Sequence, residues 1–471
     1  MTTSIANRKR IELEQKLSAL DAEFTEWTRI SQADQLFEKH HTQVLVVTAG
    51  LKGFAENIRS ELEKARQPEE ILTAARNLQS LILAVRRIWE YFRSKWIQRL
   101  EVKFQDYLKA ADELVWSFYE PVLRHRCPNP VSHCRREPPL VFLNGGLSPF
   151  ALSRDQMFQA EEVVGQAIPD DRQLQNYLRQ LPIAVIGVPW FQIRHLPDAL
   201  VLAHETAHAV EDDFALHNEM AKRYAAVGPA WEAWEREVFA DLFGCMVMGP
   251  PFLDSLMDFL AVGKSEIAVE SRLAPNWGYY PTAALRILLC VAALKTELGF
   301  PVEAERLLAQ WSAEYPGHAM PEYENCFQAI IAATLTQPIN SFNCALIKVP
   351  GLKFKQHQMK EAVTTANSLA SGSIPETVSV RVLFAAMRIL FTADPAAIQM
   401  EAPEEANPVT RPGQVSRKKP PATVFFERFK QIAKPGTRAA EQPLDGTQLE
   451  LLKKQSRELG IAMFEQVRNV H

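Results

Sequence analysis

Apolar residues recur at steps of three and four through the first part of the chain. Such spacing places one apolar stripe along each of three consecutive helices. Ser31 is the expected N-cap of the second helix, and Pro68 is the expected first residue of the third. We therefore predict a helical bundle in residues 1–122, which either buries its own seam or offers it to a regulatory protein partner or a second copy. The three series are Leu13, Leu17, Leu20, Phe24 and Trp27; Val44, Val47, Leu51, Phe54, Ile58 and Leu62; and Ile71, Ala75, Leu78, Ile82, Val85, Trp89, Phe92 and Trp96.

Two short runs further along the chain have the composition of β-strands. Leu140–Leu143 is followed by the turn signal Asn144-Gly145-Gly146, and Ile183–Val188 is β-branched and ends at Pro189. Helical spacing then returns and continues to about Phe391. The sequence therefore predicts a mainly α protein with a small β-sheet, in the α+β class.

A stretch rich in proline and charge precedes the last helical patterns. It has six prolines, the basic run Arg417–Lys419 and almost no large apolar residues, which is typical of a flexible linker. A chain of 471 residues is too long for one compact core. The predicted division is 1–122 for the N-terminal bundle, 123–300 for a central core, 301–393 for a helical extension, 394–421 for the linker and 422–471 for C-terminal helices.

Composition and charge argue against several classes of partner. The net charge of −4 gives no basic field, so we expect no nucleic-acid partner. No apolar run reaches the ~18–20 residues that cross a bilayer, and Met1–Arg10 has no apolar segment typical of a secretory signal. Six cysteines in so long a chain do not form a disulfide framework. We therefore expect a cytoplasmic protein without membrane contact, and its oligomeric state stays open.

The segment from His204 to His208 has the pattern HExxH. On a helix, residues four apart share one face, so His204 and His208 direct two imidazoles to one point, as two ligands of a tetrahedral Zn²⁺ do. Glu205 is offset from them and can take a proton from a water molecule at the metal, then return it to a leaving amine. The pattern therefore predicts a catalytic zinc site with Glu205 as its base.

Zinc needs a third protein ligand, and a second segment, Trp231–Met248, is predicted as one helix that supplies it. Within it, Glu237 has an acidic residue four positions later, Asp241, whereas the other glutamates have none. Because a carboxylate one turn beyond a ligand can accept the free ring N–H of a ligating histidine, we predict Glu237 as the ligand and Asp241 as its support. The downstream candidates are His217, Glu219, Glu232, Glu235 and Glu237.

HExxH followed by ExxAD on a separate helix resembles the gluzincin metallopeptidases, most nearly the branch of HtpX and the prenyl-protein (CAAX) proteases. Glu237-Val238-Phe239-Ala240-Asp241 matches ExxAD position by position. The resemblance covers about residues 183–289 and does not extend to the transmembrane helices of that branch. It implies a gluzincin-like peptidase core in residues 123–300.

The resemblance also implies two features beyond the ligands. That branch has a His-Pro followed by an Arg, and here Tyr280 stands in place of the His, before Pro281 and Arg286. Tyr280 is thus the implied catalytic group that steadies the oxyanion, with Tyr279 as an alternative. The strand Ile183–Val188 is the implied edge to which an extended peptide adds, with a plain core strand as the alternative.

A compact Cys/His group has a less specific pattern. It could hold a second, structural zinc ion, but its spacing matches no recognised ligand pattern, so we interpret it as a loop. Its members are His125, Cys127, His133 and Cys134.

Two other groups also have ordinary interpretations. Glu211–Asp213 could bind a cation but are more typical of a solvated helix end. Trp190 and Phe191 fit either a substrate cleft or the core.

These patterns favour a zinc-dependent metallopeptidase that hydrolyses a protein or peptide substrate, as an endopeptidase rather than an exopeptidase. One alternative is a zinc hydrolase of a non-peptide amide. The other is a non-catalytic helical scaffold whose zinc is structural. Against the scaffold, every chemical part of the site is intact in the sequence.

Overall fold

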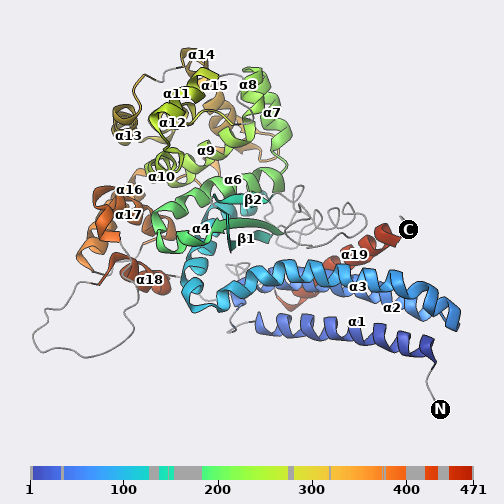
Figure 1. Ribbon diagram of the computed structural model, residues 1–471. Coiled ribbons are helices and arrows are strands. Elements are labelled where there is room, and N and C mark those ends of the chain that lie inside the picture. The colour runs from blue at the N-terminus through green and yellow to red at the C-terminus, as the bar shows by residue number, and fades with distance from the viewer. Residues whose placement is uncertain are drawn as a thin grey trace, which may run out of the picture.

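The computed structural model describes residues 4–32, 35, 37–126, 137–146, 148–152, 183–273, 280–317, 320–373, 375, 378–398, 419–432 and 445–468. These residues are mainly α-helical with a small β-sheet, as predicted (Figure 1). No described helix is both long enough and apolar enough to span a lipid bilayer. The division into five regions stays a prediction, and most of the expected linker lies outside the described residues.

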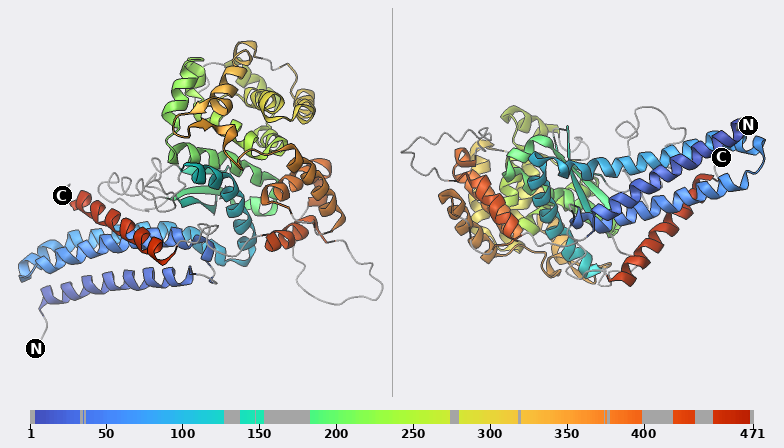
Figure 2. Two further views of the ribbon diagram at one scale, coloured as in Figure 1. Left: turned by 180° about the vertical axis from the view of Figure 1, so that it is seen from behind. Right: turned by 90° about the horizontal axis from the view of Figure 1, so that it is seen from below.

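The N-terminal helices form an elongated bundle with the last helix of the chain (Figures 1 and 2). The three predicted apolar series, apart from Ile71, lie in one buried cluster that Phe464 of the last helix joins. The bundle therefore buries its own seam, which confirms the first of the two interpretations. Its helices are α1 (Ile5–Ile30), α2 (His41–Lys64), α3 (Pro68–Ile97) and α19 (Gly446–Arg468).

The start of the second helix differs from the sequence-based expectation. Ser31 is the C-cap of α1, and its hydroxyl donates a hydrogen bond of 3.0 Å to the carbonyl oxygen of Thr28. The chain then makes a short 3-10 turn, and α2 begins only at His41. Serine hydroxyls bond nearby backbone groups at either end of a helix, so the residue type alone did not show which end it marks. Pro68 is the first residue of α3, as predicted.

A three-stranded sheet lies between the bundle and the remaining helices (Figure 1). Its strands are β1 (Glu137–Asn144), β2 (Phe150–Leu152) and β3 (Ile183–Pro189), in the order β1-β3-β2. β3 pairs in parallel with β1 and antiparallel with β2. Alternate residues contribute to different cores: Val185 belongs to the cluster of the bundle, and Ile186 to the cluster of the helices on the other face.

β3 is therefore central among the described strands, and all seven of its residues are buried. The expectation that Ile183–Val188 forms the peptide-binding edge is wrong, and the alternative of a core strand holds. Its continuous apolar composition has a physical cause, since both of its faces are covered by helices. The outer strands are β1 on one side and the short strand β2 on the other.

Residues on the far side of the sheet form a larger helical core that includes α4 (Val102–Arg126). A small hairpin, β4 (Pro338–Ile339) with β5 (Cys344–Ala345), lies among these helices. The helices are α6 (Leu202–Asp213), α7 (His217–Ala225), α8 (Pro229–Ala233), α9 (Glu235–Met248), α10 (Pro250–Leu260), α11 (Lys264–Leu273), α12 (Ala283–Ala293), α13 (Pro301–Glu314), α14 (Pro321–Glu324), α15 (Phe327–Ile331), α16 (Gln356–Ser371), α17 (Val380–Ala393) and α18 (Pro421–Ile432).

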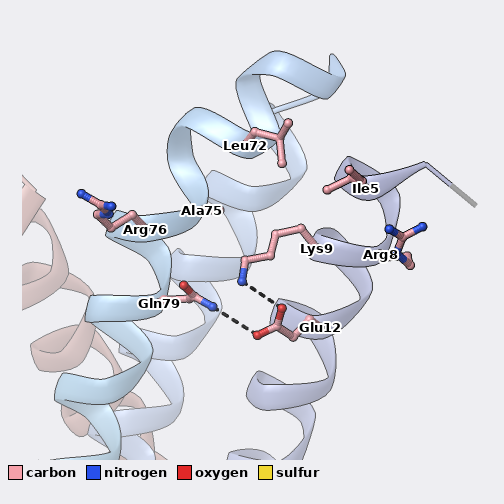
Figure 3. Close-up of a pocket in the computed structure, with 8 residues that line it drawn as sticks. All are labelled: Ile5, Arg8, Lys9, Glu12, Leu72, Ala75, Arg76 and Gln79. Carbon is pink, nitrogen blue, oxygen red and sulfur yellow. Dashed lines mark hydrogen bonds and ion pairs between the residues drawn. The ribbon is translucent and has the colours of Figure 1, made fainter.

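A groove of about 480 Å³ runs between α1 and α3 near the start of the chain (Figure 3). Glu12 lies in it and accepts hydrogen bonds from Lys9 (2.9 Å) and Gln79 (3.1 Å). Five of its eight lining residues are polar or charged, and three apolar side chains also line it. The lining residues are Ile5, Arg8, Lys9, Glu12, Leu72, Ala75, Arg76 and Gln79.

The closest approach of α19 to α2 depends on glycine. A Cβ atom at Gly460 would overlap the carbonyl oxygen of Gly50, whereas a Cβ at Gly446 would meet nothing within 4 Å. We predict that Gly460→Ala destabilises the full chain by about 1–3 kcal/mol, the usual cost of overpacking, and exposes α19 to proteases. Gly446→Ala is the matched control and should leave chemical denaturation and limited proteolysis unchanged. Equal behaviour of the two variants would contradict the close crossing.

Candidate metal centre

Two helices of the central core carry the predicted metal ligands. The segment before the HExxH residues forms a 3-10 helix over Leu196–Val201, and the chain becomes α-helical at Leu202. The segment Trp231–Met248, predicted as one helix, belongs to two helices, α8 and α9. The chain leaves helical geometry between them at Trp234 (φ −96°, ψ 5°). The HExxH residues thus begin in the first turn of α6, and Glu237 lies in the first turn of α9.

The side chains of His204, His208 and Glu237 converge on one point. His204 Nε2 lies 3.2 Å from His208 Nε2 and 3.3 Å from Glu237 Oε2. His208 Nε2 lies 3.7 Å from Glu237 Oε1. Ligand atoms ~2.0–2.1 Å from zinc at tetrahedral angles are separated by about 3.4 Å. The two distances to Glu237 involve different carboxylate oxygens, and all three separations are close to this value, so the three side chains can together supply three ligands of one ion.

A chain of buried polar contacts orients the first of these histidines. His204 Nδ1 lies 2.9 Å from Asp241 Oδ1. Arg286 of α12 donates two hydrogen bonds to the same carboxylate, from Nε to Oδ2 (2.6 Å) and from Nη2 to Oδ1 (2.8 Å). The Asp241 contact keeps a proton on Nδ1 when the carboxylate is ionised, so Nε2 is the nitrogen that can release its proton and bind a metal ion. The position of Asp241 agrees with its predicted supporting role.

The electrostatics of this group favour one positive charge at its centre. Burial lowers the pKa of His204, but hydrogen bonds to Asp241 and Glu237 outweigh this effect and raise it to about 10. Burial and the charge of His204 lower the pKa of His208 to about 4. Burial opposes ionisation of Asp241, but Arg286 and His204 hold its pKa well below the usual range. Burial also opposes ionisation of Glu237, but its hydrogen bond to His204 and the charge of that histidine lower its pKa. Both carboxylates thus remain anionic, which favours a proton or a metal ion at the imidazole nitrogens.

Glu205 is buried beside the three side chains, with 6% of its surface exposed. Burial raises its pKa to about 7, although the nearby charge of His204 and a hydrogen bond from the backbone N–H of Ala151 oppose this. Ala151 lies on β2, so the edge strand of the sheet directly contacts the HExxH helix. A carboxyl group whose pKa lies near neutrality can accept and release a proton under physiological conditions.

The other third-ligand candidates lie away from this point. His217 Nδ1 lies 2.7 Å from Glu235 Oε2, and both belong to a second cluster with Glu211. Glu219 forms an ion pair with Arg223. Glu232 is exposed.

Tyr280 lies just before α12, and its side chain is 59% exposed. Its role at an oxyanion stays a prediction, and Tyr279 lies outside the described residues. Cys127, His133 and Cys134 of the Cys/His group also lie outside them.

Three other sequence-based candidates have described positions. His125 contacts the carbonyl oxygen of Phe342 through Nε2 at 2.9 Å. Trp190 and Phe191 are 57% and 40% exposed, so neither is a core residue. Glu211 is fully buried, which contradicts the interpretation of this segment as a solvated helix end. The end of α6 is covered because His217 of α7 and Glu235 of α9 pack against Glu211.

Two contacts of the site were not predicted from the sequence. Arg286 was noted for its place in the pattern, but nothing in the sequence showed that it binds Asp241. The contact of Ala151 with Glu205 is made by a backbone N–H group, which no pattern of side chains can predict. Both contacts depend on long-range packing, of α12 on α9 and of β2 on α6.

No known protein family model matches the chain, and neither a curated protein nor a solved structure matches it. The interpretation of the site therefore depends on its own residues and geometry.

The support from Asp241 can be tested by zinc affinity. We predict that Asp241→Asn weakens zinc binding roughly 10–100-fold, as loss of a group that orients a ligand does. Asp254→Asn is the matched control: Asp254 is also buried and paired with an arginine, Arg388 (3.1 Å), but belongs to α10. Competition titration with a chromophoric chelator measures both variants. A similar loss in both would show that the effect is general destabilisation.

Proposed function

We propose that this protein is a zinc-dependent metallopeptidase of gluzincin type. The observation that carries the proposal is the convergence of His204, His208 and Glu237 at tetrahedral spacing beside the buried carboxylate of Glu205. These three side chains would hold the ion. When bound, zinc supplies a Lewis acid that lowers the pKa of a water molecule to about 7 and polarises a carbonyl group.

Glu205 is the proposed general base. Its pKa of about 7 lets the carboxylate accept a proton from the attacking water and hold it in a buried site. Glu205 then gives this proton to the amine nitrogen as the C–N bond breaks, so the products are a carboxylate and a free amine. Tyr280 would donate a hydrogen bond to the oxyanion if its exposed side chain turns inward when substrate binds.

The outer edge of β2 is the proposed binding place for an extended peptide. In an antiparallel pair, successive residues direct their backbone groups alternately toward and away from the partner strand. The N–H of Ala151 bonds Glu205 on α6, so its carbonyl oxygen also faces away from β3. That carbonyl can accept a backbone N–H from a substrate, which would align the scissile bond with the base with little demand on side chains.

Location and partners form a further part of the proposal. The described cysteines, Cys245, Cys290, Cys326 and Cys344, are unbridged, which suits a reducing cytoplasm. The N-terminal bundle would recruit or exclude substrates through its outer surface, since its seam is buried.

The proposal predicts that Glu205→Gln separates metal binding from hydrolysis. The amide preserves shape but cannot accept the proton, so turnover of a peptide library should fall at least ~10²-fold while zinc stays bound. Glu232→Gln is the control, because Glu232 is exposed on α8 near the site in sequence. Mass spectrometry of the digest and metal analysis of the same samples give both quantities.

The same experiment separates the alternatives. Zinc in the wild type without cleavage of any peptide, but with hydrolysis of small amides that depends on Glu205, would favour a non-peptide hydrolase. Zinc with neither activity would favour a scaffold with a structural ion.

A further inference from the structure

A second group of metal-binding side chain types lies on the same helices. Glu211 follows His208 by three residues on α6, His217 begins α7, and Glu235 begins α9. His217 Nδ1 lies 3.3 Å from Glu211 Oε1 and 2.7 Å from Glu235 Oε2. We propose that Glu211, His217 and Glu235 bind a divalent transition-metal ion at a site separate from the candidate zinc centre.

Buried carboxylates dominate this cluster. Glu211 and Glu235 are 0% and 1% exposed. The neighbouring cation is Arg236, which forms a two-pronged contact with Asp212 (2.9 and 3.2 Å) and reaches Glu211 only at 3.8 Å. Three carboxylates thus face the guanidinium of Arg236 and the imidazole of His217, whose pKa the hydrogen bond to Glu211 raises. Burial and the neighbouring Glu211 raise the pKa of Glu235 to about 10, so without a metal ion this carboxyl holds a proton. A divalent ion can displace that proton and bind both carboxylates.

Two buried oxygen atoms have no hydrogen-bond partner among the described residues. They are Glu211 Oε2 and Glu235 Oε1, one from each carboxylate of the cluster. Glu211 and Glu235 lie within hydrogen-bond reach of each other, so one shared proton can join them. A metal ion ligated by both groups can take the place of that proton.

The ligand types select the class of ion. One imidazole with two carboxylates suits zinc and its first-row neighbours, whereas calcium takes six to eight oxygen ligands. The His217 side chain is 49% exposed, so an ion can reach the cluster from solvent. The ion would join α6, α7 and α9, and so would fix the two helices that carry His204 and Glu237.

Zinc stoichiometry tests the proposal on the full chain. Native mass spectrometry after titration with Zn²⁺, with a competing chelator to remove weak binding, should find two ions in the wild type. His217→Ala should retain one ion, and so should the double variant His204→Ala/His208→Ala. The triple variant should retain none. His195→Ala, which removes another partly exposed histidine that contacts a carboxylate, is the control and should retain two.

The outcomes distinguish this site from the catalytic one. A wild type with one ion that His217→Ala does not affect would overturn the proposal and leave the cluster as a proton-sharing acid pair. Two ions in both wild type and His217→Ala would overturn it as well. A single ion that is lost with His217→Ala and kept in the double variant would support this site while contradicting the proposed function. Glu235→Gln preserves the volume of the side chain and should retain one ion, as His217→Ala does. Agreement of the two variants would exclude misfolding as the cause of the lost ion.

Discussion

Burial of the Asp241 carboxylate without compensation would cost several kcal/mol. The structure compensates it twice, with the guanidinium of Arg286 on one side and the Nδ1 of His204 on the other. The Asp241 carboxylate on α9 therefore joins Arg286 on α12 to His204 on α6. None of the three helices can shift without leaving a buried charge unpaired. The positions of the Nε2 atoms and of Glu237 depend on this constraint, because ligand atoms must be held within tenths of an ångström to bind zinc well.

The sheet sets the position of Glu205, the proposed general base. β3 is held between β1 and β2, and its two faces pack against separate apolar clusters. β2 is therefore fixed beside α6, where the backbone of Ala151 meets Glu205. The same arrangement leaves β2 as an outer strand, which is the proposed place of peptide addition. The N-terminal bundle supports the opposite face of the sheet and thus contributes to the site without touching it.

Local spacing in the sequence predicted what depends on helix geometry. The pairing of His204 with His208, the choice of Glu237 and the contact of Asp241 all follow from residues four apart on one helix face. The buried seams of α1, α2 and α3 follow from the same periodicity. These features need no knowledge of distant contacts, and for that reason they could be predicted.

Features that depend on long-range packing were missed or misassigned. The central place of β3 requires knowing that β2 pairs with it, and three residues of β2 carry too weak a pattern to be recognised. The docking of α19 on α2 joins segments about 400 residues apart, through glycines whose role appears only where backbones meet. The cluster of Glu211, His217 and Glu235 likewise arises because three helix ends converge. The sequence offered these residues as candidate ligands, but only in separate groups.

The central claim is that His204, His208 and Glu237 together hold one zinc ion. Anomalous X-ray diffraction from crystals of the zinc-loaded protein, with data collected on both sides of the zinc absorption edge, tests it most directly. The account predicts an anomalous peak ~2.0–2.2 Å from His204 Nε2, His208 Nε2 and a Glu237 carboxylate oxygen. Zinc-edge peaks elsewhere in the molecule but none among these three side chains would contradict it.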